Sequence, residues 1–222
     1  MVIQVALKNE ANESASVLDD SVLAAYNEAI QECNPELERV LGRYASSNRA
    51  LSGSSPFMQV FLSNSNLLPG DSRIITRKEL EAARSRSQDF LARNYTTFGL
   101  ALVTARDSYE PNDLPARILA EQLSERGISL GEGKLIPLTF LSLQEDGNSH
   151  YGEVFVLNDK AIKDNVLDLN DFKWDSFRNE GLSCAGLGRC GGWGAYGRDL
   201  GGSDGDGRVA VVSGEATSRK IL

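Results

Sequence analysis

Cysteine and histidine are among the side chains of this 222-residue chain that could carry nucleophilic chemistry. The chain has three cysteines, Cys33, Cys184 and Cys190, and a single histidine, His150. A cysteine hydrolase needs its nucleophilic sulfur within hydrogen-bond reach of a base. One open hypothesis is therefore a small hydrolase in which Cys184 or Cys190 attacks and His150 serves as base. The cysteines are too few for a disulfide framework and lack the ligand spacing of zinc sites, although Cys184 and Cys190 are close enough to pair.

Glycine and aspartate gather in the C-terminal part of the chain. Of 21 glycines, 11 lie between Gly181 and Gly207. Two windows there, 186–191 and 192–197, match the G-x-G-x-x-G pattern of dinucleotide-binding folds, which requires a strand before it and a helix after it. The sequence predicts a helix before these windows and a Gly/Asp-rich loop after them. Because the aspartates also lack the spacing of a calcium loop, we expect neither a cofactor nor a metal.

The overall composition disfavours several classes of function. Lys and Arg number 23 against 31 Asp and Glu, a net charge of −8, which disfavours nucleic-acid binding. The basic stretch 73–93 also contains acids and is interpreted as a solvated helix face. The chain contains no run of 18 apolar residues, so the sequence predicts no membrane-spanning helix. Residues 1–10 lack the features of a secretory signal. We therefore expect a cytoplasmic protein, or one displayed by an unconventional or particle-borne route.

Helical and strand patterns are mixed without regular β-α alternation, which predicts an α+β fold. Helices are expected over 16–33, 35–44, 76–93 and 112–127, with a short one over 169–177. Strands are expected over 2–7, 57–62, 98–105, 134–143, 151–157 and 209–213, with a hairpin turn at 145–148. Thr76 and Glu79 form a predicted capping box, while Asn112 or Asp113 is expected to cap the following helix.

The block 182–207 has an unusual composition. It contains no Lys, Glu, Gln or Met, whereas residues 1–181 contain 6, 15, 6 and 2 of them. Apart from Trp193, all its residues can be encoded by codons that end in a pyrimidine. That is the output expected when asparagine codons of a template are randomised at adenine. Large apolar residues recur in the block, so we interpret it as an ordered surface and not as a flexible linker.

The C-terminal stretch 173–213 resembles the C-terminus of variable proteins from diversity-generating retroelements. The resemblance rests on 173–182, on the loop around Trp193 and on 206–213, about 40 residues in all. Proteins of that family use a C-type lectin fold and display hypervariable, ligand-binding residues near the C-terminus. The resemblance implies a C-type-lectin-like α+β domain with mixed, mainly antiparallel short strands and two or more helices.

The resemblance also implies which residues vary and which form the scaffold. The variable, ligand-binding positions would be Cys184, Gly186, Gly188, Arg189, Cys190, Gly192, Gly194, Tyr196 and Asp204. The scaffold would be Trp174, Gly181, Leu182, Leu187, Trp193, Leu200 and the strand from Arg208 to Val212. The lectin-like domain would span 56–214 with its variable region at 181–208, after an N-terminal part, 1–55, expected to pack on it, and before a tail, 215–222.

The main functional hypothesis is a non-enzymatic binding protein whose unknown ligand is a protein or another surface molecule. Tyrosine and arginine would anchor that ligand, with small residues giving adaptable contacts. Two alternatives stay open: the cysteine hydrolase, and a structural or assembly subunit in which the glycine-rich block forms an oligomer contact. The oligomeric state is not indicated by the sequence.

Overall fold

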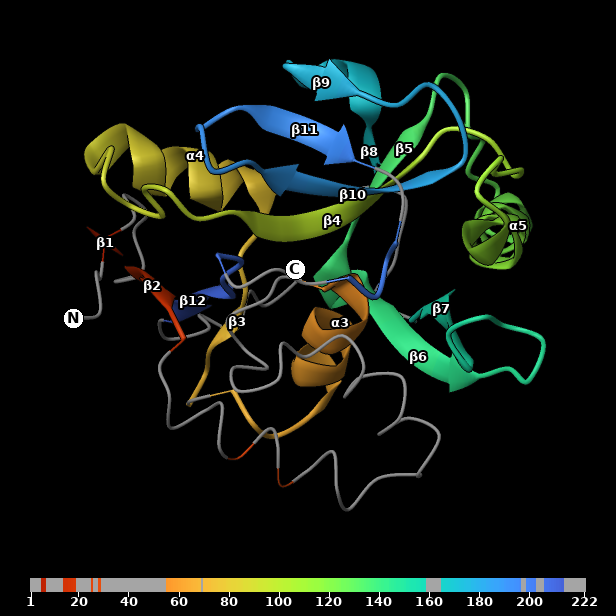
Figure 1. The fold of residues 1–222 in the computed structure, drawn as a ribbon, viewed down its shortest axis with the longest axis horizontal. Coiled ribbons are helices and arrows are strands. Elements are labelled where there is room, and N and C mark those ends of the chain that lie inside the picture. Colours follow the sequence, from red (N-terminus) through yellow and green to blue (C-terminus); the bar gives the residue numbers. More distant parts are fainter. Residues whose placement is uncertain are drawn as a thin grey trace, which may run out of the picture.

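The computed structural model describes residues 5–6, 14–18, 25, 28, 55–68, 70–158, 165–196, 199–202 and 206–213. Within these ranges three helices are interspersed with short strands in mixed sheets, so the predicted α+β class is confirmed (Figure 1). Several expectations lie outside the described residues. They concern Cys33, the helix over 35–44, the tail 215–222 and the variable position Asp204.

A six-stranded sheet lies at the centre of the molecule (Figure 1). Its strands, in spatial order, are β8 (Leu167–Asp168), β5 (Lys134–Pro137), β4 (Thr96–Leu102), β10 (Leu182–Leu187), β11 (Trp193–Tyr196) and β9 (Ser176–Phe177). Neighbours pair antiparallel except β11 and β9, which are parallel. Every residue of β4 is buried. The predicted central strand over 98–105 is therefore confirmed, with bounds shifted toward the N-terminus.

Two smaller sheets complete the β structure. One is a hairpin of β6 (Leu141–Glu145) and β7 (Glu153–Leu157), as predicted around 145–148. The other has the order β1 (Val5–Ala6), β2 (Ser14–Val17), β12 (Ala210–Ser213) and β3 (Arg73–Ile74). Because Ser16 and Val17 belong to β2, the predicted start of a helix at residue 16 is wrong; Ala25 and Glu28 are helical.

Helix α3 (Pro56–Asn64) corrects the predicted strand over 57–62. The Ser55 hydroxyl accepts a hydrogen bond from the Met58 amide at 3.5 Å, and Pro56 occupies the first turn. Both are start signals for a helix. The helix is buried on most sides, so its continuous apolar run shows no helical stripe and resembles a buried strand.

Helices α4 (Arg77–Arg86) and α5 (Glu110–Glu125) match two predicted helices with different ends. The capping box at Thr76 forms, but α4 ends at residue 86 and not near 93. Helix α5 begins before Asn112, so neither Asn112 nor Asp113 caps it. The predicted helix over 169–177 is a single 3-10 turn, η4 (Leu169–Asp171), followed by β9.

The residues of the central sheet contribute to two apolar cores, and Figure 1 shows α3 and α4 on opposite sides of this sheet. Helices α3 and α5 and the hairpin contribute to the core on one face, together with Leu100 and Leu102 of β4. Helix α4 packs on the other face, with Phe98 and Ala101. A 3-10 turn, η2 (Leu138–Phe140), splits the predicted strand 134–143 between β5 and β6. Strand β10, which carries the predicted variable positions Cys184 and Gly186, contributes Leu182 to the first core and Ala185 and Leu187 to the second.

Candidate functional site

Strands β10 and β11 bring four predicted variable positions onto one face of the central sheet. Cys184 is the Cα partner of Tyr196, and Gly186 is the partner of Gly194. Successive residues of a strand point to opposite faces, so these four share one side. The alternate residues join the core that packs on α4: Ala185, Leu187, Trp193 and Ala195.

A β-bulge lies beside Gly186. This glycine pairs with Thr97 while the residue before it pairs with Gly99, which leaves Phe98 as an extra residue of β4. A Cβ atom on Gly186 would lie 2.7 Å from the carbonyl oxygen of Thr96. Bulges are common next to functional sites, where they redirect neighbouring side chains. Here the bulge brings two main chains close together.

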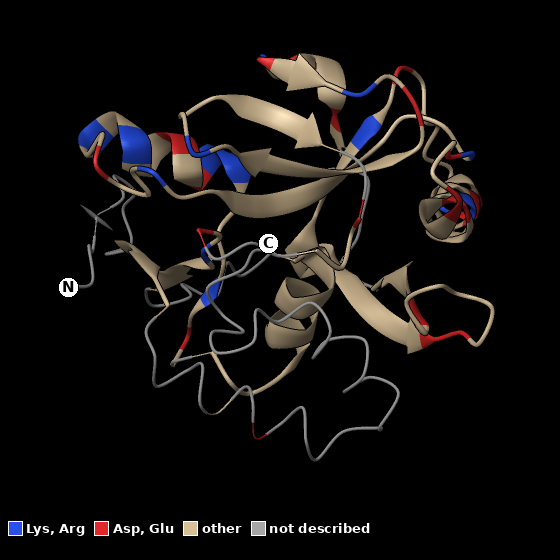
Figure 2. Cartoon of the chain, in the orientation of Figure 1, with Lys and Arg blue, Asp and Glu red and all other residues tan. Residues whose placement is uncertain are grey.

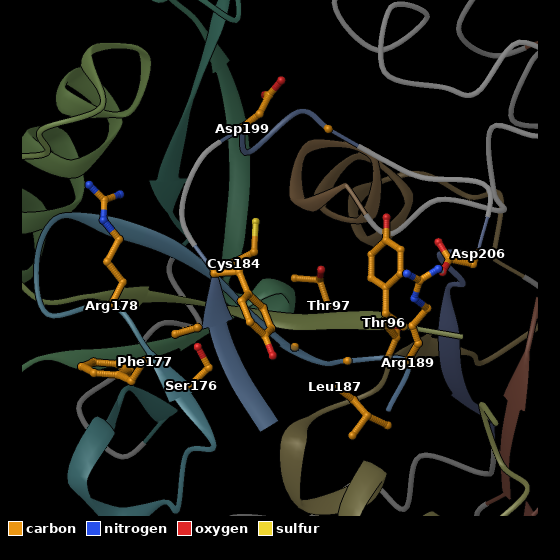
Figure 3. A pocket seen from close by; sticks show the side chains of 16 residues that line it. Thr96, Thr97, Ser176, Phe177, Arg178, Cys184, Leu187, Arg189, Asp199 and Asp206 are labelled. Carbon is orange, nitrogen blue, oxygen red and sulfur yellow. The ribbon is translucent and has the colours of Figure 1, made fainter. Parts of the chain in front are cut away.

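A cavity of about 860 Å³ opens on this face. Five predicted variable positions line it: Cys184, Gly186, Gly188, Arg189 and Tyr196. Strands β4 and β9 contribute further walls, among them Thr96, Thr97, Ser176 and Phe177. Figure 3 shows Arg178 and Arg189 toward opposite sides of the cavity, with Cys184 and Thr97 between them. The guanidinium of Arg189 pairs with Asp206, with 2.8 Å between Nη1 and Oδ2.

The other predicted variable positions lie around the turn between β10 and β11. The Gly188 amide donates to the carbonyl of Gly192 at 2.8 Å, which closes the turn. Cys190 is exposed in that turn. Gly194 faces the ring of Tyr196. Of the nine positions, eight are therefore described, and all eight belong to one strand pair and its turn.

The thiol groups bear on the hydrolase hypothesis. Cys184 and Cys190 are both free, so they do not pair with each other. Burial, with a further contribution from Asp199, raises the pKa of the Cys184 thiol to about 12, so the thiol stays protonated at neutral pH. His150 is exposed in the hairpin turn with its ring edge-on to Tyr151, and it is not among the described residues that line the cavity. This geometry gives the hydrolase hypothesis no support.

A buried carboxylate holds the start of β10. Asp107 accepts the Leu182 amide at 2.8 Å and two nitrogens of Arg178 at 2.7 and 3.1 Å. Burial by itself lowers the pKa of Arg178. The hydrogen bonds to Asp107 and Glu180 together have the larger effect, so the pKa of Arg178 is raised overall. Gly181, at φ +62°, lies so close that a Cβ atom there would overlap the Asp107 carboxylate. Only glycine fits both that conformation and that space.

A second buried network connects Leu200 to Leu182, the first residue of the block 182–207. The Leu200 amide donates to the Tyr151 hydroxyl at 3.3 Å, and this hydroxyl donates to Asn112 at 2.6 Å. The side-chain amide nitrogen of Asn112, Nδ2, donates to the main-chain carbonyl of Leu182 at 3.4 Å. The Ser55 hydroxyl donates to the carbonyl of Leu200, also at 3.3 Å. Leu182 and Leu200 are thus bonded to one set of residues outside the block.

Arg77 holds the opposite face of the strand pair. Its side chain is 3% exposed, and its guanidinium carbon lies 4.4 to 4.6 Å from the ring centres of Phe172, Trp174 and Trp193. It also donates to the carbonyl of Lys173 at 2.7 Å. Both predicted scaffold tryptophans therefore pack on one cation, and Trp193 is anchored to the core side of the sheet.

No relative identifies the site. Comparison of the chain with protein-family models, with curated proteins and with solved structures finds no match. Within the described ranges, no group of three or more His, Cys, Asp or Glu side chains is placed to hold a metal ion. None of the helices in those ranges is long and apolar enough to cross a membrane. The site is therefore interpreted from its own geometry.

The residues that hold the site were mostly not singled out from the sequence. Asp107 and Arg178 are 71 positions apart, so no local pattern reveals their pairing. Asn112 was singled out only as a possible helix cap, and the local sequence gives no indication of its buried hydrogen bond with Tyr151. Lys and Arg gather along α4 (Figure 2), which made Arg77 look like part of a solvated face although it is buried.

Proposed function

We propose that this protein is a non-enzymatic ligand-binding protein, a retroelement-diversified variable protein with a C-type-lectin-like fold. Its ligand site is the cavity on β10 and β11. One observation carries the proposal: five positions selected from sequence composition and resemblance alone line a single cavity. All five lie on the strand pair β10 and β11 or in its turn, on the side of the sheet that lines the cavity, so a ligand bound there would contact them together.

The exposure of the variable side chains supports the proposal. The side chain of Arg189 is 69% exposed, and Tyr196 is 50% exposed. A Cβ atom on Gly188 would meet its nearest neighbours at 3.5 Å, an ordinary contact. Replacement at these positions changes the cavity wall and leaves the two cores untouched, as a diversified surface requires.

The anchoring of the block also supports the proposal. Asp107, Asn112 and Tyr151 hold its residues Leu182 and Leu200, and all three lie outside the positions expected to vary. A framework independent of the variable residues lets many sequences share one backbone. The size of the cavity falls in the range of roughly 300–1,000 Å³ found for ligand pockets, which suits a small ligand or a projecting side-chain cluster of a partner protein.

Sequencing the DNA around the gene tests this function. We expect a reverse transcriptase gene nearby, together with a near-copy of the segment that encodes 181–213. The two copies should differ only opposite adenines of the template, at codons such as those of Arg189 and Tyr196. The codons of Trp193 and Arg208 should be identical in both. A locus without a reverse transcriptase gene and without a second copy contradicts the proposal.

A further inference from the structure

The ring of Tyr196 lies on Gly194, two residues earlier in β11. A Cβ atom built on Gly194 would overlap ring atoms of Tyr196, including its hydroxyl. The corresponding Cβ position on Gly188 lies 3.5 Å from the same hydroxyl. The phenol therefore runs back along the strand over Gly194, with its hydroxyl next to the turn that follows β10.

This placement depends on the missing side chain at residue 194. Residues two apart on a strand share a face, so a side chain at 194 would stand where the ring now lies. Tyr196 is half exposed, and its ring is held on one side by the strand and open to solvent on the other. When the two compete for space, the exposed ring is the group that moves.

We propose that Gly194 is a specificity-determining position of the cavity, which acts by setting where the ring of Tyr196 lies. The inference rests on the proposed function of the cavity as a ligand site. Tyr196 lines the cavity and is the Cα partner of Cys184, so a displaced ring changes the wall beside that cysteine. Positions 194 and 196 then act as one unit, and an aromatic residue at 196 presents a different surface for each residue at 194.

The other glycines on this face supply contrasts. At Gly186 the obstacle is the main-chain carbonyl of Thr96, which cannot rotate away. At Gly188 the nearest atoms, the Tyr196 hydroxyl and the Gly192 carbonyl, leave room for a methyl group. Of Gly186, Gly188 and Gly194, Gly194 is the one whose Cβ position overlaps the far part of an exposed side chain. Gly188→Ala is therefore a matched control, because it adds one methyl group to the same face.

Nuclear Overhauser effects in the full chain test the coupling without a ligand. In the wild-type protein, ring protons of Tyr196 should show effects to the α protons of both Gly194 and Gly188. In Gly194→Ala the effect to Gly188 should disappear and the ring shifts should move toward those of a solvated tyrosine. In Gly188→Ala the effects to Gly194 should persist. A Gly188 contact that survives in Gly194→Ala, or is absent from the wild type, overturns the inference.

Thermal unfolding gives a second test, because Gly194→Ala should change Tm in opposite directions in two backgrounds. Gly194→Ala should lower Tm in the wild-type background, where the ring must leave its position. In the Tyr196→Ala background it should raise Tm, because alanine is favoured over glycine inside a strand. An equal shift in both backgrounds contradicts the inference. Neither test uses a ligand or the DNA around the gene. Failure of this inference can therefore be distinguished from failure of the proposed function.

Discussion

At the residue scale, Gly186 differs from its neighbours on the cavity face in what a side chain would meet. Its Cβ position lies 2.7 Å from the carbonyl oxygen of Thr96, on the adjacent strand. Gly188, two residues further, meets nothing closer than 3.5 Å. Both were predicted as variable from the sequence, and both line the cavity. The surrounding structure thus has more room for a side chain at Gly188 than at Gly186.

We expect Gly186→Ala to destabilise the fold by about 1–3 kcal/mol, the usual cost of forcing extra atoms into a packed site. The methyl group would press on the main chain of Thr96, which pairs with β10 and is also held by a hydrogen bond from the Thr96 hydroxyl to the carbonyl of Arg208. Gly188→Ala, the control, should change stability by less than about 0.5 kcal/mol, as exposed substitutions do. Urea unfolding measures both, and equal stability of the two variants would contradict this account.

At the scale of elements, Arg77 joins three segments that are distant in sequence. It lies in the first turn of α4 and contacts the segment 172–174 and the first residue of β11. Its Nη1 has no hydrogen-bond partner among the described residues, so the aromatic rings compensate for part of its burial. Because desolvated cation–π contacts are strong, we expect this one side chain to stabilise the position of Trp193 at the start of β11.

Replacing Arg77 with methionine keeps an apolar stem of similar length and removes the cation. We expect a loss of at least about 2 kcal/mol, the value of a desolvated cation–π contact. Lys78→Met is the matched control, since Lys78 is the next residue of the same helix and is exposed. Chemical unfolding followed by circular dichroism compares them. If Arg77→Met and Lys78→Met unfold at the same denaturant concentration, the aromatic cluster does not depend on the charge.

The elements that could be predicted from the sequence were those with local signals. The capping box at Thr76 and the hairpin turn after Glu145 depend on residues close in sequence, whereas strands β10 and β11 were not predicted. Helix α3 could not be distinguished from a strand, because a segment buried on most sides has no polar face to reveal its period. The positions expected to vary came from the resemblance, whereas the residues that hold them depend on contacts between segments distant in sequence.

At the scale of the whole molecule, one buried acid links folding to pH. Glu153 is 5% exposed in β7, and its Cα partner in the hairpin is Glu145. Burial, with repulsion from Glu145, raises the pKa of Glu153 from 4.5 to about 7. The folded protein therefore binds this proton more tightly than the unfolded chain does. Its stabilising effect is complete below about pH 4.5 and is lost as the pH rises to about 7.

We expect Tm to fall as the pH rises from 5 to 7.5, with Glu153→Gln flattening this slope because glutamine stays neutral throughout. Glu145→Gln should reduce the slope only in part, since burial is the larger cause of the shift. Calorimetry across this pH range measures all three proteins. A wild-type Tm that does not vary between these values, or a slope retained in Glu153→Gln, contradicts the assignment.

The aromatic cluster around Arg77 also determines what spectroscopy can detect. The chain has two tryptophans, Trp174 and Trp193, and both stack on that one guanidinium. Intrinsic tryptophan emission is therefore a reporter of a single location, on the side of the sheet that faces α4. Tyrosines 95 and 196 line the cavity. A titration monitored by tryptophan emission would follow unfolding of the framework, while occupancy of the cavity would have to be followed through tyrosine signals.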